Sequence, residues 1–458
     1  MEPIAASFRD PDGYLFKKDG LILRKVNQSY FQDYQHLMDS GLYSELVNRG
    51  WLLSHEELES DNASKILKPE QLKYVSYPYE WSFSQLKESA LLTLEIQLLA
   101  LKHGMTLKDA SAYNVQLHDG KPRFIDTLSF ERYEEGSPWS AYRQYCQHFL
   151  APLVLTVYRD YRLTHLLKSF IDGIPLDLTS SLLPRSSWFN FSLLAHIHLH
   201  AKSQVRYADE ARSSESVKQV EMSKVRFEGL ISSLISATKK LEWQPPNTEW
   251  GNYYSDTNYI DDAMREKEAM VQEFVRDSGS TGRVAADFGA NTGRFSRIAA
   301  GEGYSVLSYD VDEVAVERNY RQIRENDETA LYPLLLDVTN PSPGIGWANQ
   351  ERDPVIGRTH IDLGLALAVI HHIAISNNVP LVRCAELFAH MCERLIIEFV
   401  PKSDSQVVRL LATREDIFPD YTESGFREAF EQYFTIEKAL PISGTERHLY
   451  LMVRRAGR

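Results

Sequence analysis

The sequence has little cysteine and no long hydrophobic run, and both absences narrow the class of protein. Its three cysteines, Cys146, Cys384 and Cys392, form no C-x-x-C pair, so neither a zinc site nor a disulfide framework is indicated. A reducing compartment is the simple interpretation. The first ten residues lack a signal peptide's apolar core, and the longest apolar stretch, residues 149–158, is too short to span a bilayer. We therefore expect a soluble, cytoplasmic protein that does not insert into membranes.

Positive charge is also in deficit. Lys and Arg number 50 against 63 Asp and Glu, which gives a formal net charge of −13. A large, sequence-independent grip on nucleic acid needs a basic surface, so we expect no bulk nucleic-acid partner, although a local basic groove stays open. The 458 residues suffice for two or three ordinary domains. No feature of the sequence indicates the oligomeric state.

The chain divides near residue 245, where Pro245 and Pro246 indicate a linker. We predict an α+β, helix-rich domain over 1–245 and a second domain over 246–458. In the second domain strands and helices alternate, which predicts an α/β fold with a doubly wound, mostly parallel sheet. For the first domain the local patterns predict a hairpin at 12–27, short helices within 28–60, a strand at 74–77, an amphipathic helix at 84–103, a hairpin within 113–131 and further helices at 138–205 and 223–240.

The strongest motif is residues 284–296, VAADFGANTGRFS, in which a short apolar strand ends in Asp287 and a glycine-containing turn follows. A ligand that approaches the backbone at the end of a strand needs small side chains there, which Gly289 and Gly293 supply. Asn291 stands where another glycine often sits, and Asn tolerates left-handed backbone. The alternatives are a generic strand–turn–helix and a nicotinamide site, but the latter favours G-x-G-x-x-G, from which GANTG departs.

Acids also follow the next two predicted strands. Residues 305–309 lead to Asp310, whose carboxylate is placed to accept both ribose hydroxyls of a bound nucleoside. A solvated loop acid is the alternative for Asp310, and Asp312 could take its place. Residues 331–336 lead to Asp337, which suits the exocyclic amine of adenine.

This ordered set of features resembles the class I S-adenosylmethionine (AdoMet) dependent methyltransferase family over residues of about 250–455. The D-F-G-A-N-T-G turn resembles the family's first motif, Asp310 its ribose-binding acid and Asp337 its adenine-side acid. The A-V-I-H-H-I run resembles the end of the family's fourth strand, which borders the substrate. The resemblance implies a Rossmann-like fold, AdoMet as cofactor, and methyl transfer to an acceptor that the sequence does not identify.

Candidate catalytic residues follow the fourth and fifth predicted strands, 361–370 and 394–400. Methyl transfer is an in-line displacement, and a hydroxyl or ammonium acceptor also needs a base. His371 and His372 are candidates because histidine titrates near neutral pH, and Glu398 lies in the fifth strand. The alternative is that one histidine packs under the sheet edge and the other hydrogen-bonds the backbone. Four aromatic residues ahead of the first motif suit either a lid or simple packing: Trp250, Tyr253, Tyr254 and Tyr259.

The N-terminal half carries a second constellation. Asp109 and Asn114 form a D-x-x-x-x-N pattern, and Asp126 follows after a predicted hairpin. In phosphoryl transfer an Asp orients the acceptor hydroxyl, while an Asn and a second Asp hold the metal that bridges the nucleotide phosphates.

This spacing resembles the protein-kinase and aminoglycoside-phosphotransferase superfamily. The resemblance implies Asp109 as the base, Asn114 and Asp126 as metal ligands, and Mg-ATP as a second cofactor. No Gly-rich loop precedes the motif, D-T-L replaces D-F-G, and Lys25 is the best candidate for the phosphate-binding lysine. Three interpretations stay open: a hairpin tied by structural carboxylates, a kinase-like fold without catalysis, and an active kinase.

Taken whole, the two-part arrangement is similar to bacterial methyltransferase-like proteins that include NoeA-type host-specificity nodulation proteins. We expect a methyltransferase whose kinase-like N-terminal domain binds or selects the substrate. The acceptor is a small metabolite, a saccharide intermediate or a protein side chain. The alternatives are a bifunctional enzyme that phosphorylates and methylates, and a binding protein that holds AdoMet or a nucleotide without turnover.

Overall fold

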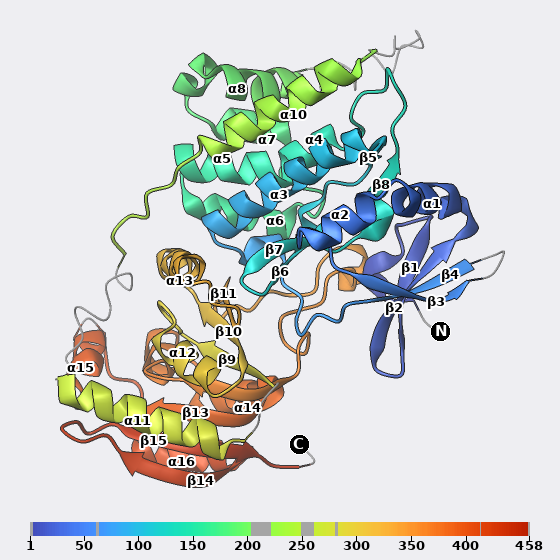
Figure 1. Ribbon diagram of the computed structural model, residues 1–458. Helices are drawn as coiled ribbons and strands as arrows, with labels where there is room; N and C mark the ends of the chain where they lie inside the picture. Colours follow the sequence, from blue (N-terminus) through green and yellow to red (C-terminus); the bar gives the residue numbers. More distant parts are fainter. Residues whose placement is uncertain are drawn as a thin grey trace. The chain divides into compact units, whose positions relative to one another are not determined.

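The computed structural model is drawn in Figure 1, and it describes residues 3–60, 64–202, 221–248, 261–279, 283–412 and 414–456. Two compact units make up the chain. The N-terminal unit comprises Met1–Leu72, Ser76–Gln244 and Gly344–Asp353, and the C-terminal unit comprises Lys73–Val75, Pro245–Pro343 and Pro354–Arg458.

The N-terminal unit begins with a four-stranded antiparallel sheet in the order β1-β2-β4-β3. The predicted hairpin is confirmed, with Asp19 and Gly20 at φ values of 52° and 79° in its turn. The short helices that follow the hairpin are also present. The elements are β1 (Gly13–Lys18), β2 (Leu21–Asn27), α1 (Phe31–Asp39), α2 (Leu42–Asn48), β3 (His55–Ser60) and β4 (Ser64–Pro69).

Two sequence predictions in this region are wrong. Residues 55–60 form strand β3 rather than a helix, because pairing with β4 fixes a segment whose own sequence lacks apolar alternation. Residues 74–77 form no strand. The backbone amide and carbonyl of Ser76 both hydrogen-bond the side-chain amide of Gln116, at 2.8 Å each, in place of a neighbouring strand.

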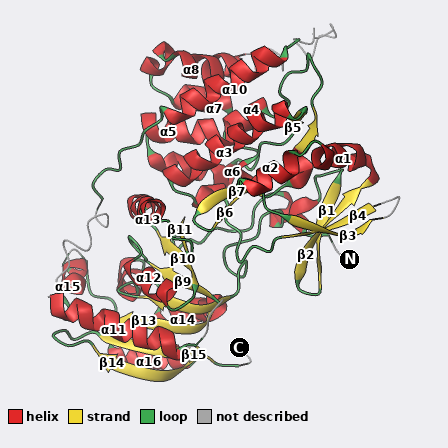
Figure 2. Ribbon diagram, in the orientation of Figure 1, coloured by secondary structure: helices red, strands yellow, loops and turns green. Residues whose placement is uncertain are grey.

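The rest of the N-terminal unit is mainly helical (Figure 2) and is built around α3 (Phe83–Lys102). This confirms the helix predicted at 84–103, and its side chains at Leu86, Leu94 and Leu101 are fully buried. Two small sheets pair β5 with β8 and β6 with β7. The other elements are β5 (Met105–Leu107), β6 (Val115–His118), β7 (Lys121–Phe124), β8 (Phe130–Arg132), α4 (Tyr142–Tyr145), α5 (Ala151–Tyr158), α6 (Leu166–Ser169), α7 (Leu176–Leu182), α8 (Phe191–Leu193) and α10 (Lys224–Lys239).

A loop from late in the sequence, Gly344–Asp353, is part of the N-terminal unit. Its Glu351 is buried and forms a bidentate ion pair with Arg9, with contacts of 2.7 and 3.0 Å. The guanidinium of Arg352 lies 4.2 Å from the ring centroid of Tyr113. The unit therefore includes side chains from both halves of the sequence.

The C-terminal unit is built on a seven-stranded sheet in the order β11-β10-β9-β12-β13-β15-β14. Strand β15 runs opposite to the other six strands and is antiparallel to both of its neighbours, β13 and β14. The doubly wound, mostly parallel sheet is confirmed, and β9 and β10 are buried along their whole length, as strands covered on both faces must be. The strands are β9 (Val284–Phe288), β10 (Ser305–Asp310), β11 (Leu331–Leu335), β12 (Ile361–Ala366), β13 (Cys392–Phe399), β14 (Phe434–Pro441) and β15 (His448–Arg454).

Helices flank this sheet (Figure 2), and α11 contributes Val271 and Phe274 to a core shared with Ala285 and Val306 of the strands. The helices are α11 (Asp261–Asp277), α12 (Arg294–Gly301), α13 (Glu313–Glu325), α14 (Leu381–Met391), α15 (Ser405–Leu411) and α16 (Glu423–Glu431).

The predicted fourth strand, 361–370, is too long. Strand β12 ends at Ala366, Ala368 has a φ of 55°, and a helical turn has begun by His371. The left-handed residue reverses the chain before the apolar run ends, so hydrophobicity alone overestimated the strand. Among the helices of the described residues, none is both long and apolar enough to cross a bilayer.

Candidate functional site

A cavity of about 400 Å³ lies in the C-terminal unit at the carboxyl ends of β9, β10, β11 and β12. Adjacent parallel strands end at one edge of a sheet, so the residues that follow them meet there. The structure brings five of the six predicted cofactor-binding residues to the cavity wall: Asp287, Gly289, Asn291, Asp310 and Asp337.

The turn after β9 is tied to the end of β10. The backbone amides of Gly289 and Ala290 both donate to the carbonyl of Tyr309, at 2.8 Å each. Gly289 has a φ of 78°, and a Cβ atom there would lie 2.5 Å from Cγ2 of Val369. Only glycine fits this position without displacing a cavity wall.

Asn291 and Gly293 complete the turn in the left-handed region, with φ values of 50° and 81°. The expectation that Asn291 keeps the conformation usually left to glycine is confirmed. Gly293 lies outside the cavity lining. It precedes α12, where a Cβ atom would lie 2.6 Å from Oδ1 of Asn319, so its part is to let the helix begin close to α13.

Asp287 and Asp310 present buried carboxyl groups to the cavity. Asp287 accepts a hydrogen bond from the Ser296 hydroxyl at 2.6 Å, and Asp310 accepts from the amides of Asn291 (2.7 Å) and Asp312 (2.8 Å). Burial raises the pKa of each carboxyl to about 6, although these hydrogen bonds favour the charged form. Both groups therefore change charge near neutral pH.

Asp312 and Asp337, the two other acids near the cavity, have different hydrogen-bond partners. Asp312 caps α13 by accepting from the amide of Val314 at 2.8 Å, so it serves the helix rather than replacing Asp310. Asp337 lies two residues beyond β11, is half-buried, and accepts from the Thr339 amide at 2.8 Å and hydroxyl at 2.6 Å.

The two candidate histidines differ in exposure to the cavity. His372 lines it, and burial lowers the pKa of its imidazole to about 4. His371 is 2% exposed and lies outside the lining, with its ring centroid 4.0 Å from that of His372. Burial lowers the pKa of His371 well below its usual value, and its Nδ1 has no hydrogen-bond partner. Of the pair, His372 alone can meet a ligand in the cavity.

Glu398 is fully buried between two cations. One carboxylate oxygen is 2.5 Å from the Lys267 Nζ atom, and the other is 3.1 Å from a nitrogen of Arg447. Arg447 in turn forms a bidentate pair with Asp404, at 2.7 and 3.0 Å. Glu398 is absent from the cavity lining, and its carboxylate holds the two cations in place.

Lys267, which the sequence motifs did not indicate, is 2% exposed and lines the cavity. Its ammonium group lies 4.9 Å from the ring centroid of Phe295, and burial lowers its pKa. A signal was present in the sequence. In α11, Lys267 falls three residues after Met264 and four before Val271, so it interrupts an apolar stripe with a charge.

The structure also brings together the three polar residues predicted in the N-terminal half, Asp109, Asn114 and Asp126. The Asn114 side-chain amide donates to the Ser129 hydroxyl at 3.0 Å, and that hydroxyl donates to Asp126. Burial raises the pKa of the Asp109 carboxyl, and the negative charge of Asp126 raises it further. The three predicted residues thus share one polar cluster within the N-terminal unit.

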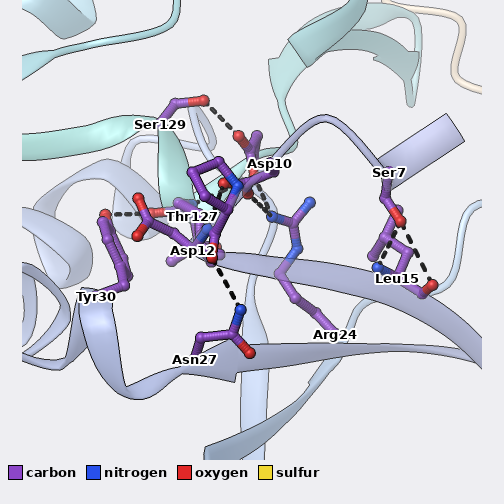
Figure 3. Close-up of polar contacts among 12 residues, drawn as sticks. Ser7, Asp10, Asp12, Leu15, Arg24, Asn27, Tyr30, Thr127 and Ser129 are labelled. Carbon is purple, nitrogen blue, oxygen red and sulfur yellow. Dashed lines mark hydrogen bonds and ion pairs between the residues drawn. The ribbon is translucent and has the colours of Figure 1, made fainter. Parts of the chain in front are cut away.

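Arg24, rather than Lys25, is the cation at this cluster. Its guanidinium is 2.5 Å from Asp126 and 3.9 Å from Asp10, and Figure 3 shows it reaching from β2 toward Asp10. Successive side chains of a strand point to opposite faces, and the Lys25 ammonium instead lies 5.7 Å from the ring centroid of Tyr14. The nucleotide-binding roles of Lys25, Asp109, Asn114 and Asp126 stay predictions.

Four further residues singled out in the sequence lie outside the part of the chain that the structure describes: Trp250, Tyr253, Tyr254 and Tyr259.

The strand order, the reversed direction of β15 and the acids Asp287 and Asp310 at the carboxyl ends of β9 and β10 define the class: the C-terminal unit has the class I AdoMet-dependent methyltransferase fold. The chain as a whole belongs to the family of the nodulation protein NoeA. NoeA of Rhizobium meliloti (strain 1021) is 34% identical over 466 residues, which cover 98% of this chain and 96% of NoeA. No family model matches the sequence.

Solved structures similar to this chain include three methyltransferases. Magnesium protoporphyrin IX methyltransferase from Synechocystis PCC 6803 with bound SAH is 19% identical, covering 44% of this chain and 89% of that one, with a TM-score of 0.31. The N-methyltransferase NodS from Bradyrhizobium japonicum WM9 is 12% identical, covering 42% and 97%, with a TM-score of 0.32. The bifunctional kinase-methyltransferase WbdD is 18% identical, covering 42% and 40%, with a TM-score of 0.30.

The buried pair beside the cavity yields a stability prediction. Lys267→Met leaves the Glu398 carboxylate with one cation, so we expect the free energy of unfolding to fall by about 3 kcal/mol. Lys267→Met/Glu398→Gln removes both charges and should recover part of that loss. Urea unfolding of the wild type, both single variants and the double variant should give a coupling energy of at least about 1 kcal/mol.

The matched control is Lys438→Met, which removes a partly exposed lysine paired with Glu273 and Asp277. That change should cost no more than about 1 kcal/mol, because surface ion pairs contribute little. Strictly additive losses from Lys267→Met and Glu398→Gln would contradict the coupling.

Proposed function

We propose that this protein is an AdoMet-dependent methyltransferase that acts in the cytoplasm on a small metabolite, a saccharide intermediate or a protein side chain. Catalysis is assigned to residues 246–458, and residues 1–245 bind or select the acceptor. The observation that carries the proposal is the cavity at the carboxyl ends of β9–β12, with Asp310 and Gly289 in its wall.

The residues of the cavity fit AdoMet chemically. The Asp310 carboxylate is available to accept hydrogen bonds from the ribose hydroxyls. Asp337 is available to accept a hydrogen bond from the exocyclic amine of adenine. Gly289 leaves a hollow that a Cβ atom would close. Asp287, Asp310 and Asp337 give the cavity three carboxyl groups, which suit a ligand that carries a sulfonium and an ammonium.

The chain's own part in methyl transfer is alignment, exclusion of water and removal of a proton. Bound AdoMet supplies the activated methyl group. The apolar side chains of Phe295, Leu367 and Val369 line the cavity and exclude water from the bound ligand. We assign the role of general base to His372. Because its pKa is lowered to about 4, its imidazole is neutral at pH 7 and takes the proton from the hydroxyl or ammonium group of the methyl acceptor.

The first test of this function is AdoMet binding. Calorimetric titration should give micromolar affinity for the wild type, and Asp310→Ala should weaken it at least about tenfold, or about 1.4 kcal/mol. The control is Glu325→Ala, which removes an exposed acid at the end of the helix that follows Asp310. Absence of AdoMet binding by the wild type would overturn the proposal.

The pH dependence of AdoMet binding gives a second test. Hydroxyl donors bind the ionised Asp310 carboxylate better than its protonated form, and the pKa of this group is raised to about 6. The affinity for AdoMet should therefore be highest well above pH 6 and should fall as the pH drops below 6. The fall should be up to about tenfold per pH unit for each carboxyl proton that must be released on binding. Position 310 cannot titrate in Asp310→Asn, so the profile of this variant should be less steep and keep only the contribution of Asp287. A wild-type affinity that is constant from pH 7 to about pH 5 would contradict the role of Asp310.

Phosphotransfer in the N-terminal unit is the second candidate function, favoured by the grouping of Asp109, Asn114 and Asp126. The Asp126 carboxylate is engaged by Arg24 and by the Ser129 hydroxyl, so a divalent ion there would have to displace the guanidinium. The present arrangement does not fit a formed Mg-ATP site, and no step is assigned to it.

Titration with Mg-ATP tests whether the cluster of Asp109, Asn114 and Asp126 binds nucleotide or only stabilises the fold. An active phosphotransferase requires Mg²⁺-dependent ATP binding that Asp126→Ala abolishes and Asp119→Asn, in the exposed hairpin turn, leaves unchanged. ATP binding that is equal in the wild type and Asp126→Ala would show that the cluster is structural.

A further inference from the structure

Large apolar side chains are exposed on three consecutive elements of the N-terminal unit. Phe189 is 91% exposed, Phe191 79%, Leu199 50% and Trp188 36%. They lie on a 3-10 helix, η8 (Arg185–Phe189), on α8, and on a π-helix, η9 (Leu194–Leu199), which follow one another in the chain and contact one another. We call these four residues the aromatic patch. Two largely exposed phenylalanines with a single residue between them indicate an interaction surface.

The backbone that carries the aromatic patch is firmly held. The buried imidazole of His198 hydrogen-bonds the Ser180 hydroxyl at 2.7 Å and the Ser187 hydroxyl at 2.9 Å. The Trp188 ring stacks on the same imidazole, with centroids 4.2 Å apart. Asn190, between the two phenylalanines, accepts from the amide of Ser192 at 3.1 Å. Phe189 and Phe191 are therefore exposed on a backbone that is itself held by hydrogen bonds and ring stacking.

The segment that carries the patch contains no acidic residue. The chain has 63 Asp and Glu among 458 residues, about one in seven, yet residues 178–202 contain none. Two exposed cations lie in this segment: Arg185 begins η8, and the Lys202 ammonium lies 4.7 Å from the Trp188 ring centroid.

The neighbouring helix continues this charge pattern. Ser233 of α10 hydrogen-bonds His196 of η9 at 3.0 Å, which fixes the part of α10 that packs there. Residues 229–241 contain no acid, and they include Lys239 and Lys240, both exposed.

We propose that the aromatic patch docks this protein on an anionic lipid bilayer. Aromatic side chains prefer the boundary between headgroups and acyl chains, and flanking Lys and Arg are attracted to anionic headgroups. The remainder of a chain with a net charge of −13 is repelled by the same surface, so the cationic rim also sets the orientation. Self-association through the patch is disfavoured, because it would bring the same cations of two copies together. The attachment is peripheral: Phe189 and Phe191 enter the interface, and no helix of the described residues is long and apolar enough to span the bilayer.

Co-sedimentation of the full chain with vesicles tests this docking. One set contains phosphatidylcholine alone, and the other contains about 30 mol % phosphatidylglycerol in phosphatidylcholine. We expect binding to the anionic vesicles and at least tenfold less to the neutral ones. Phe189→Ser/Phe191→Ser should lower the partition coefficient for anionic vesicles at least about tenfold. The double variant Arg185→Gln/Lys202→Gln should lower it several-fold and remove most of its dependence on salt.

The matched control is Val408→Ser/Ile417→Ser, which removes two exposed apolar side chains of the C-terminal unit, 53% and 56% exposed, and should leave vesicle binding unchanged. Circular dichroism checks that every variant is folded. The proposal is overturned if the wild type ignores anionic vesicles or if Phe189→Ser/Phe191→Ser binds them as the wild type does. It is also overturned if sedimentation velocity shows a dimer that this variant abolishes, because the patch would then bind a second copy. None of these measurements depends on AdoMet.

Discussion

Two hydrogen bonds to one carbonyl hold the candidate site together. Because the amides of Gly289 and Ala290 both donate to Tyr309, the chain that leaves β9 is fixed to the last residues of β10. This contact brings the buried carboxyl groups of Asp287 and Asp310 to one cavity. It also requires left-handed backbone at Gly289, a conformation that nearly every other residue resists.

The cavity concentrates groups whose charge is costly to bury. Asp287 and Asp310 respond with raised pKa values, and Lys267 responds by pairing with Glu398. These are different solutions to the same desolvation. The two carboxyl groups are held mainly by hydrogen bonds and have raised pKa values, whereas the Lys267 ammonium has a direct carboxylate partner.

The parts of the site that sequence could predict are those in which local chemistry decides. The acid, the small residues and the left-handed Asn291 occur within one short motif, and Asp310 follows the next strand in order. Lys267 and Glu398 are separated by 131 residues, so their pairing depended on how α11 packs against β13. The choice between Arg24 and Lys25 depended on which face of β2 meets Asp126, which is set by tertiary packing.

The same division holds for the fold. Long periodic segments such as α3 and the parallel strands were predicted because burial imposes their pattern. Strand β3 was not, because an edge strand of polar residues owes its conformation to its partner β4. His371 and His372 could not be separated in the sequence, since a left-handed Ala368 and the turn after it decide which imidazole faces the cavity.

The loop Gly344–Asp353 has a consequence for how this protein was assembled. Its Glu351 and Arg352 complete the N-terminal unit by binding Arg9 and Tyr113, yet they are encoded within the C-terminal half. A gene cut at residue 245 would separate Arg9 from its buried counter-ion and uncover one face of Tyr113. The two halves of the sequence are therefore poor candidates for separate expression or for exchange between relatives, because a cut at residue 245 divides the N-terminal unit itself.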